Sequence, residues 1–132
     1  MSIYLICIAM LGLLCLGLGF NVAITRAKLG VLYGGEADPE SKLYKAQRAH
    51  GNTTEYAPIL AVLIFALGQS SQPSWVTIAM VAVTFFRYLF VLGILAPATM
   101  NKVNPMRLVG SLGSFLSGFA LIAALLIQAI HA

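Results

Sequence analysis

Four long stretches of apolar residues run along this chain and limit the folds open to it. Residues 3–24, 75–96 and 108–130 are almost wholly apolar, and residues 40–67 change from polar to apolar halfway along. A helix of about 20 apolar residues crosses the hydrocarbon core of a bilayer. Charged residues make up 9% of the chain, whereas soluble domains carry roughly 25%. We therefore predict an all-α integral membrane protein, with residues 1–132 forming one domain, a four-transmembrane-helix bundle.

Turn and helix-start residues separate these stretches. Asp38 and Pro39 predict a turn, and Ser41 behind them is a favourable residue for capping the start of a helix. Pro73 lies in the uncharged connection 69–74, and Pro97 ends the third stretch. The first stretch has no basic segment before it and is longer than the roughly 7–15 apolar residues of a cleavable signal peptide, so we expect it to be retained.

Basic residues are concentrated in the first and third connections and their flanks. The second connection has no Lys or Arg, whereas the other two hold Arg26, Lys28, Lys42, Lys45, Arg48, Lys102 and Arg107. Loops rich in Lys and Arg stay on the cytoplasmic side of a membrane. We therefore expect a bacterial inner membrane protein with the first and third loops cytoplasmic and both termini periplasmic. This rule also explains the net charge of +4 without a nucleic-acid partner.

Small residues recur in the fourth stretch, where Gly110, Ser114 and Gly118 are spaced four residues apart. Gly12 and Gly17 lie in the first stretch. Small residues at this spacing allow membrane helices to approach closely. Packing within one chain and contact between copies of the chain both explain them.

Two charged residues, Glu55 and Arg87, lie inside the apolar stretches. An ionisable group at membrane depth costs at least ~2.5–3.5 kcal/mol, so it is normally paired or functional. From their similar depth we predict a Glu55–Arg87 ion pair. Such a pair could belong to a ligand site or could only join two helices.

A stripe of polar residues follows one side of the predicted second helix. At about 100° per residue it contains Ser41, Tyr44, Lys45, Arg48, Asn52, Glu55 and Tyr56. Lys45 fits an ordinary surface stripe, but the last three lie at membrane depth and must face protein or a wet cavity. Guanidinium, amide, carboxylate and phenol groups together suit a small zwitterionic ligand such as glutathione, and equally an anionic lipid headgroup. Pro58, one turn beyond, is expected to kink this helix.

The same segment carries a recognisable motif. Arg48, Asn52, Glu55 and Pro58 follow one another at intervals of four, three and three residues, and Tyr56 lies beside Glu55. This pattern closely resembles the signature of the MAPEG family, the membrane-associated proteins in eicosanoid and glutathione metabolism, and the chain looks like a bacterial-type member.

The resemblance implies a homotrimer that binds glutathione between protomers near the cytoplasmic face, with no metal. Carried over by position, the glutathione-binding residues would be Arg26, Arg48, Asn52, Glu55, Tyr56 and Arg87, with Lys28 as the alternative to Arg26. It further implies a glutathione transferase or peroxidase that acts on lipophilic electrophiles, with membrane lipids around it.

The residues expected to activate the thiol group of glutathione depart from the family pattern. Family enzymes often carry a hydroxyl or imidazole side chain three residues after the third-span Arg and a Tyr seven after it, where this chain has Phe90 and Ile94. An Arg follows in the family at the position of Asn101, so Arg107 is our catalytic candidate and Lys102 its competitor. A non-catalytic glutathione- or lipid-binding membrane protein is the alternative. A proton-coupled multidrug exporter is disfavoured because the first stretch has no charged residue before Arg26.

Overall fold

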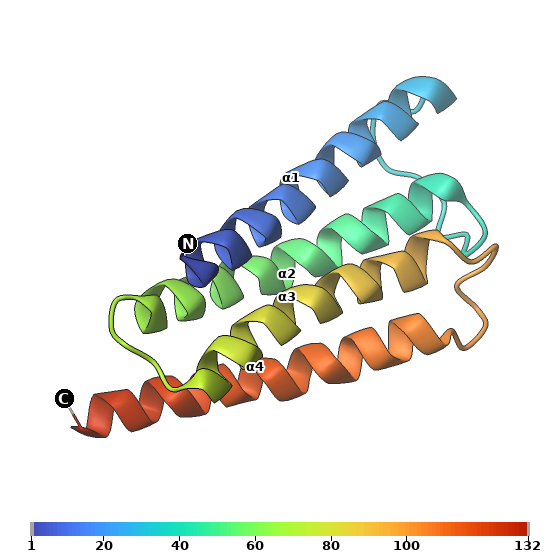
Figure 1. Ribbon diagram of the computed structural model, residues 1–132. Helices are drawn as coiled ribbons and strands as arrows, with labels where there is room; N and C mark the ends of the chain where they lie inside the picture. Colours follow the sequence, from blue (N-terminus) through green and yellow to red (C-terminus); the bar gives the residue numbers. More distant parts are fainter. Residues whose placement is uncertain (1, 132) are drawn as a thin grey trace.

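The computed structural model describes residues 2–131 and contains four helices (Figure 1). They are α1 (Ile3–Leu29), α2 (Lys42–Gly68), α3 (Ser74–Leu95) and α4 (Pro105–His131). No strand occurs within this described part. The predicted all-α, four-helix architecture is therefore confirmed.

The four helices run roughly along one direction, and consecutive helices are antiparallel (Figure 1). The connections 30–41 and 96–104 lie together at one end of the bundle, which we call the basic end, and both termini lie at the other (Figure 1). In the described residues α1 contacts α2 and α3 but not α4, and α4 packs chiefly on α3. Toward the basic end α1 leans away from the other helices (Figure 1).

Three of the helices, α1, α3 and α4, are long and apolar enough to cross a membrane. This supports an integral membrane protein. By the same measure α2 falls short, because its first half carries the polar stripe. The crossing of α2 and the orientation of the bundle remain predictions.

Local sequence signals explain where the helices begin and end. The side chain of Ser41 accepts a hydrogen bond from the backbone N–H three residues on, which confirms it as the cap of α2. Asn104 caps α4 in the same way, and Pro105 follows in the first helical position, where its missing N–H costs nothing. Helix α1 extends beyond the predicted residue 24 to Leu29, and Gly30 caps its end with a φ of 67°, which suits glycine. Helix α2 continues through Pro58.

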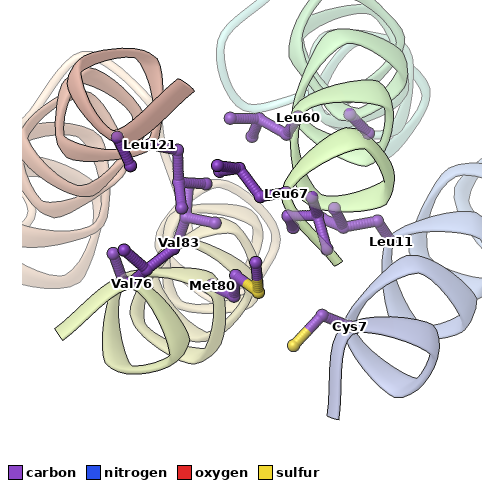
Figure 2. Packing of buried hydrophobic residues seen from close by; sticks show 12 residues of the cluster. Cys7, Leu11, Leu60, Leu67, Val76, Met80, Val83 and Leu121 are labelled. Carbon is purple, nitrogen blue, oxygen red and sulfur yellow. The ribbon is translucent and has the colours of Figure 1, made fainter. Parts of the chain in front are cut away.

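The main core lies in the half of the bundle away from the basic end. Residues from all four helices meet there, among them Cys7, Leu11, Leu60, Leu67, Val76, Met80, Val83 and Leu121 (Figure 2). A second, smaller cluster near the basic end contains Leu14, Leu18, Ala49, Val91 and Ile94. Both clusters are apolar, so the bundle can carry few polar groups at the same depth without providing each with a partner.

Glycines bring α3 and α4 into close contact. A Cβ atom on Gly110 would lie 2.5 Å from the backbone nitrogen of Phe90, and one on Gly113 would collide with the ring of Phe86. Gly93 of α3 faces the backbone of Arg107 in the same way. The small residues of α4 therefore serve packing within the chain. Gly12 of α1 has open space around it.

Replacing Gly110 should test this contact. We expect Gly110→Ala to lower the free energy of unfolding by about 1–3 kcal/mol, because the added methyl group has backbone atoms of α3 in its way. Gly12→Ala is the matched control, and it should leave stability unchanged or raise it, since alanine favours a helix by up to about 1 kcal/mol over glycine. Thermal unfolding of the two variants in detergent measures both. Equal losses in the two variants would contradict the packing described here.

Candidate functional site

A polar cluster between α2 and α3 is built around Arg87. This side chain is 2% exposed. Its Nη2 atom donates a hydrogen bond of 2.7 Å to Oδ1 of Asn52. Its Cζ atom lies 5.1 Å from the centre of the Tyr56 ring and 5.0 Å from that of Phe90. Three of the predicted site residues, Asn52, Tyr56 and Arg87, are thus brought together.

Helix periodicity explains this cluster. Asn52 and Tyr56 are four residues apart and lie on the same side of α2, as Arg87 and Phe90 do on α3 at a spacing of three. Two aromatic rings and one amide replace part of the water that the guanidinium has lost. The Nε atom of Arg87 is buried and has no hydrogen-bond partner among residues 2–131. A buried donor without a partner is costly, so the residues of a single chain do not fully satisfy the guanidinium of Arg87.

The cluster forms one end of a groove between α2, α3 and α4, with a volume of about 250 Å³. At this end the groove has polar walls, provided by Asn52, Tyr56, Arg87, Ser111 and Ser114. Further from the basic end it is apolar, and its walls include Ile59, Leu63, Phe115, Phe119 and Ile122. An amphipathic molecule, or a polar molecule beside an apolar one, fits this division.

The predicted Glu55–Arg87 ion pair is not formed, and that expectation was wrong. Arg87 uses Asn52 instead, and Glu55 is exposed. Three residues turn a helix by about 300°, so Glu55 lies about 60° around α2 from Asn52, on the outer side. Arg48, one turn before Asn52, is exposed as well. Neither Glu55 nor Arg48 lines the groove of its own chain.

Arg26 is also separate from the groove. It lies in the last turn of α1, which has no contact with α4 in the described part of the chain. Its side chain is half-buried, whereas Lys28, the alternative, is exposed. A single chain therefore does not unite the predicted binding residues, and they form an inner set on the groove and an outer set beside it.

Arg107 supports the connection between α3 and α4. Its Nη1 atom donates to the backbone oxygen of Met100 and its Nη2 atom to that of Lys102, both at 3.0 Å. The side chain also lines a second cavity of about 340 Å³, which shares Phe90 and Ser111 with the groove. The predicted catalytic residue thus lies near the groove, on the far side of Phe90.

Lys45 has a related role that its place in the polar stripe did not indicate. It is buried, and its Nζ atom donates to the backbone oxygen of Pro97 at 2.8 Å. We expected a surface lysine at this position. Sequence reasoning missed this contact because the acceptor is a backbone carbonyl 52 residues away, which leaves no side-chain signal.

Ile94, the position where family enzymes carry a tyrosine, lies in the core. It is 2% exposed and packs in the cluster with Leu14 and Leu18 of α1. Ile94 does not line the groove. The walls that sequence reasoning missed, Ser111, Phe115 and Phe119, belong to α4, and they resemble ordinary membrane-helix residues.

Comparison with known proteins agrees with the family resemblance of the sequence motif. The MAPEG family model matches residues 4–127, nearly the whole chain. The chain belongs to the MAPEG family. Neither the curated proteins nor the solved structures provide a significant match. Membership of MAPEG thus rests on the full-length family match, and the helical architecture agrees with it.

Removing the amide partner of Arg87 should weaken the fold of this MAPEG protein. We expect Asn52→Ala to lower the free energy of unfolding by about 1.5–3 kcal/mol, because a hydrogen bond to a buried charged group is lost. Lys42→Ala, on an exposed side chain in the first turn of the same helix, should change it by less than about 0.5 kcal/mol. Thermal unfolding in detergent without ligand provides the measurement. If Asn52→Ala is as stable as the parent protein, the hydrogen bond to Arg87 has no energetic weight.

Proposed function

We propose that this MAPEG protein binds glutathione and uses it as co-substrate in transfer to lipophilic electrophiles or in reduction of lipophilic peroxides. The observation that carries the proposal is the cluster of Arg87, Asn52 and Tyr56 at the polar end of an apolar groove. Arg87 lines the groove and keeps one donor, Nε, without a partner, so its positive charge is available to attract an anionic ligand. The apolar end of the groove suits a lipophilic partner beside it.

The side chains supply what glutathione requires. Guanidinium groups bind carboxylates through paired hydrogen bonds, and a carboxylate binds an amine. Arg48, Arg87 and Arg26 would hold the two carboxylates, and Glu55 would hold the amino group. Asn52 and Tyr56 would orient the peptide.

Assembly as a homotrimer is part of this proposal. Arg48 and Glu55 are exposed on α2, and Arg26 lies on α1 away from the groove. Charged groups facing lipid would cost at least ~2.5–3.5 kcal/mol each, so the outer side of α2 requires a cover. A neighbouring copy of the chain would cover it and would bring the outer set of binding residues against a groove. We place this assembly in a bacterial inner membrane, with the basic end in the cytoplasm.

The chemistry would depend on thiolate formation. A free thiol has a pKa near ~8.5, and a nearby guanidinium lowers it toward the nucleophilic thiolate. Arg107 is the candidate for this role because its cavity adjoins the groove at Phe90. The apolar end of the groove would hold the electrophile within reach of the sulfur. Holding the two reactants close together and correctly oriented would speed their reaction.

Two substitutions test glutathione binding. We expect Arg48→Ala and Glu55→Gln each to weaken glutathione affinity by roughly ten- to a hundredfold, because each removes a charge-assisted hydrogen bond worth about 1.5–3 kcal/mol. Isothermal titration calorimetry in detergent measures the affinity, and size-exclusion chromatography checks that the oligomer persists. Thr54→Ala, an exposed neighbour outside the proposed set, is the control. Unchanged glutathione affinity in both variants would show that Arg48 and Glu55 do not bind glutathione.

A non-catalytic binding protein is the second candidate, and specific observations favour it. The guanidinium of Arg107 is engaged with two loop carbonyls, Phe90 offers no hydroxyl, and Ile94 lies in the core. Of these three residues only Phe90 lines the groove, and it has no donor that could stabilise a thiolate. Such a protein would bind glutathione or a lipid without turnover.

Arg107→Ala separates the two candidates. For an enzyme we expect kcat with a reactive aryl halide to fall at least about tenfold with little change in glutathione affinity, since an interaction made mainly with the thiolate affects the chemical step. The apparent pKa of bound glutathione, followed by thiolate absorbance against pH, should rise in the same variant. Lys102→Ala is the control. Binding without turnover in the parent protein would support the binding-protein candidate. Turnover in the parent protein with unchanged kcat and thiol pKa in Arg107→Ala would keep the enzyme and remove Arg107 from the catalytic role.

A further inference from the structure

The serines of α4 differ in what their hydroxyl groups bond to. Ser114 donates to the backbone oxygen of Gly110, and Ser117 donates to that of Gly113. A serine inside a membrane helix commonly makes such a bond to its own helix. Ser111 makes no hydrogen bond within the described part of the chain. Its side chain is half-buried, so its hydroxyl group is available to a ligand.

Ser111 lies where two cavities meet. The groove and the second cavity share two walls, Ser111 of α4 and Phe90 of α3. Of the two cavities, Arg87 lines only the groove and Arg107 lines only the second one. Ser111 is four residues after Arg107, so the two side chains project from the same side of α4. Ser111 therefore stands between the groove that holds one guanidinium and the cavity that holds the other.

The contact between α3 and α4 fixes this position. A Cβ atom on Gly110 would lie 2.5 Å from the backbone nitrogen of Phe90, so the two backbones touch one residue before Ser111. Because elements packed this closely resist displacement, Ser111 is held at the level of Phe90. A donor that is fixed before the reaction stabilises developing charge without the cost of reorganisation.

A thiolate at this junction requires a hydrogen-bond donor. The proposed reaction needs the glutathione sulfur within reach of Arg107, which places the sulfur near the two shared walls. Phe90 has no side-chain donor, and both Nη atoms of Arg107 are engaged with loop carbonyls. A hydrogen bond to the charged form of a group favours that form and lowers the pKa of a thiol. The hydroxyl group of Ser111 has the chemistry and the place to provide it.

We propose that Ser111 is a catalytic residue whose hydroxyl group donates a hydrogen bond to the glutathione sulfur and favours the thiolate. This role rests on the proposed function, and it supplies a donor that neither Phe90 nor Ile94 provides. The thiol proton passes to solvent, and Ser111 stays neutral throughout. With an aryl halide, the thiolate sulfur forms the new bond to carbon, and the halide leaves with the electron pair of the broken bond.

Tyr56 also carries a hydroxyl group on the groove wall and is the competing donor. It belongs to α2, its ring packs edge-on against Phe115, and it does not line the cavity of Arg107. We therefore expect Tyr56→Phe to affect glutathione affinity and to leave the pKa of the bound thiol unchanged. The two hydroxyl groups can thus be told apart by experiment.

The pKa of bound glutathione tests the proposal without requiring turnover. Glutathione is bound to the protein in detergent, and the ultraviolet absorbance of the thiolate is followed against pH. Ser111→Ala should raise the pKa of the thiol, with an acid dissociation constant about tenfold smaller, because it removes the donor and little volume. Ser111→Thr keeps a hydroxyl group and should restore most of the effect. Ser117→Ala is the matched control, since this hydroxyl is bonded to its own helix and does not line the groove.

Turnover of a reactive aryl halide gives a second measurement. At neutral pH we expect Ser111→Ala to lower kcat about tenfold with little change in the KM for glutathione. The difference should shrink as the pH rises above the pKa of the thiol, because the thiol then ionises without the donor. A purely structural role of Ser111 would alter thermal stability or KM and would leave the pH profile of kcat in place.

The possible failures are distinguishable. An unchanged thiol pKa in Ser111→Ala, with glutathione bound as tightly as in the parent protein, would overturn the role of Ser111 and leave the proposed function standing. A shift in Tyr56→Phe instead of Ser111→Ala would do the same. A parent protein that does not bind glutathione in calorimetry would overturn the proposed function and this role with it. A shifted thiol pKa in Ser111→Ala without turnover in the parent protein would keep the hydrogen bond and overturn its catalytic role.

Discussion

The buried guanidinium of Arg87 is the constraint on which the rest of the site depends. A charge at this depth requires partners, and the bundle supplies one amide and two aromatic rings from α2 and α3. These partners fix how α2 lies against α3 near the basic end. They also create the polar end of the groove, because the side chains that satisfy Arg87 are those that line it. Stability and site geometry therefore have the same origin here.

Helix α4 contributes shape to this arrangement, and α2 and α3 contribute the chemistry. The glycines of α4 let it approach α3 closely, and other residues of α4, Ser111, Ser114, Phe115 and Phe119, line the groove. Two of its serines bond to their own helix, since Ser114 donates to the backbone oxygen of Gly110 and Ser117 to that of Gly113. They present small side chains without leaving unsatisfied polar groups in the apolar part of the bundle. A bulkier α4 would fill the groove, and a more polar one would need partners of its own.

Much of the fold could be predicted from the sequence, because hydropathy and turn residues act locally. The number of helices, the cap at Ser41 and the grouping of the basic connections all followed from such signals. The meeting of Asn52, Tyr56 and Arg87 followed from helical spacing and the cost of burying a charge. Which residue pairs with Arg87 could not be predicted. Glu55 and Asn52 are only about 60° apart around α2 and lie at similar depth, so depth alone does not tell which of them reaches the guanidinium.

The carbonyl contacts of Arg107 and Lys45 were also outside the reach of sequence reasoning. Every residue has a backbone oxygen, so no pattern marks Met100, Lys102 or Pro97 as an acceptor. The walls from α4 were missed for a related reason. Ser111, Phe115 and Phe119 are common in membrane helices, and only the packing of three helices gives them a place on the groove.

The way in which the α3–α4 connection is held has a consequence for how this chain can change over time. Lys45 of α2 and Arg107 of α4 donate hydrogen bonds to backbone oxygens of this connection. The acceptors belong to Pro97, Ala98, Met100 and Lys102. The path of the segment is thus set by residues outside it. Apart from Asn104, which caps α4, Thr99, whose hydroxyl accepts from the backbone of Asn101, and Met100, which packs on the smaller cluster, its side chains can vary without loss of these contacts. This rim can therefore acquire new contacts at the membrane surface while the bundle beneath it stays the same.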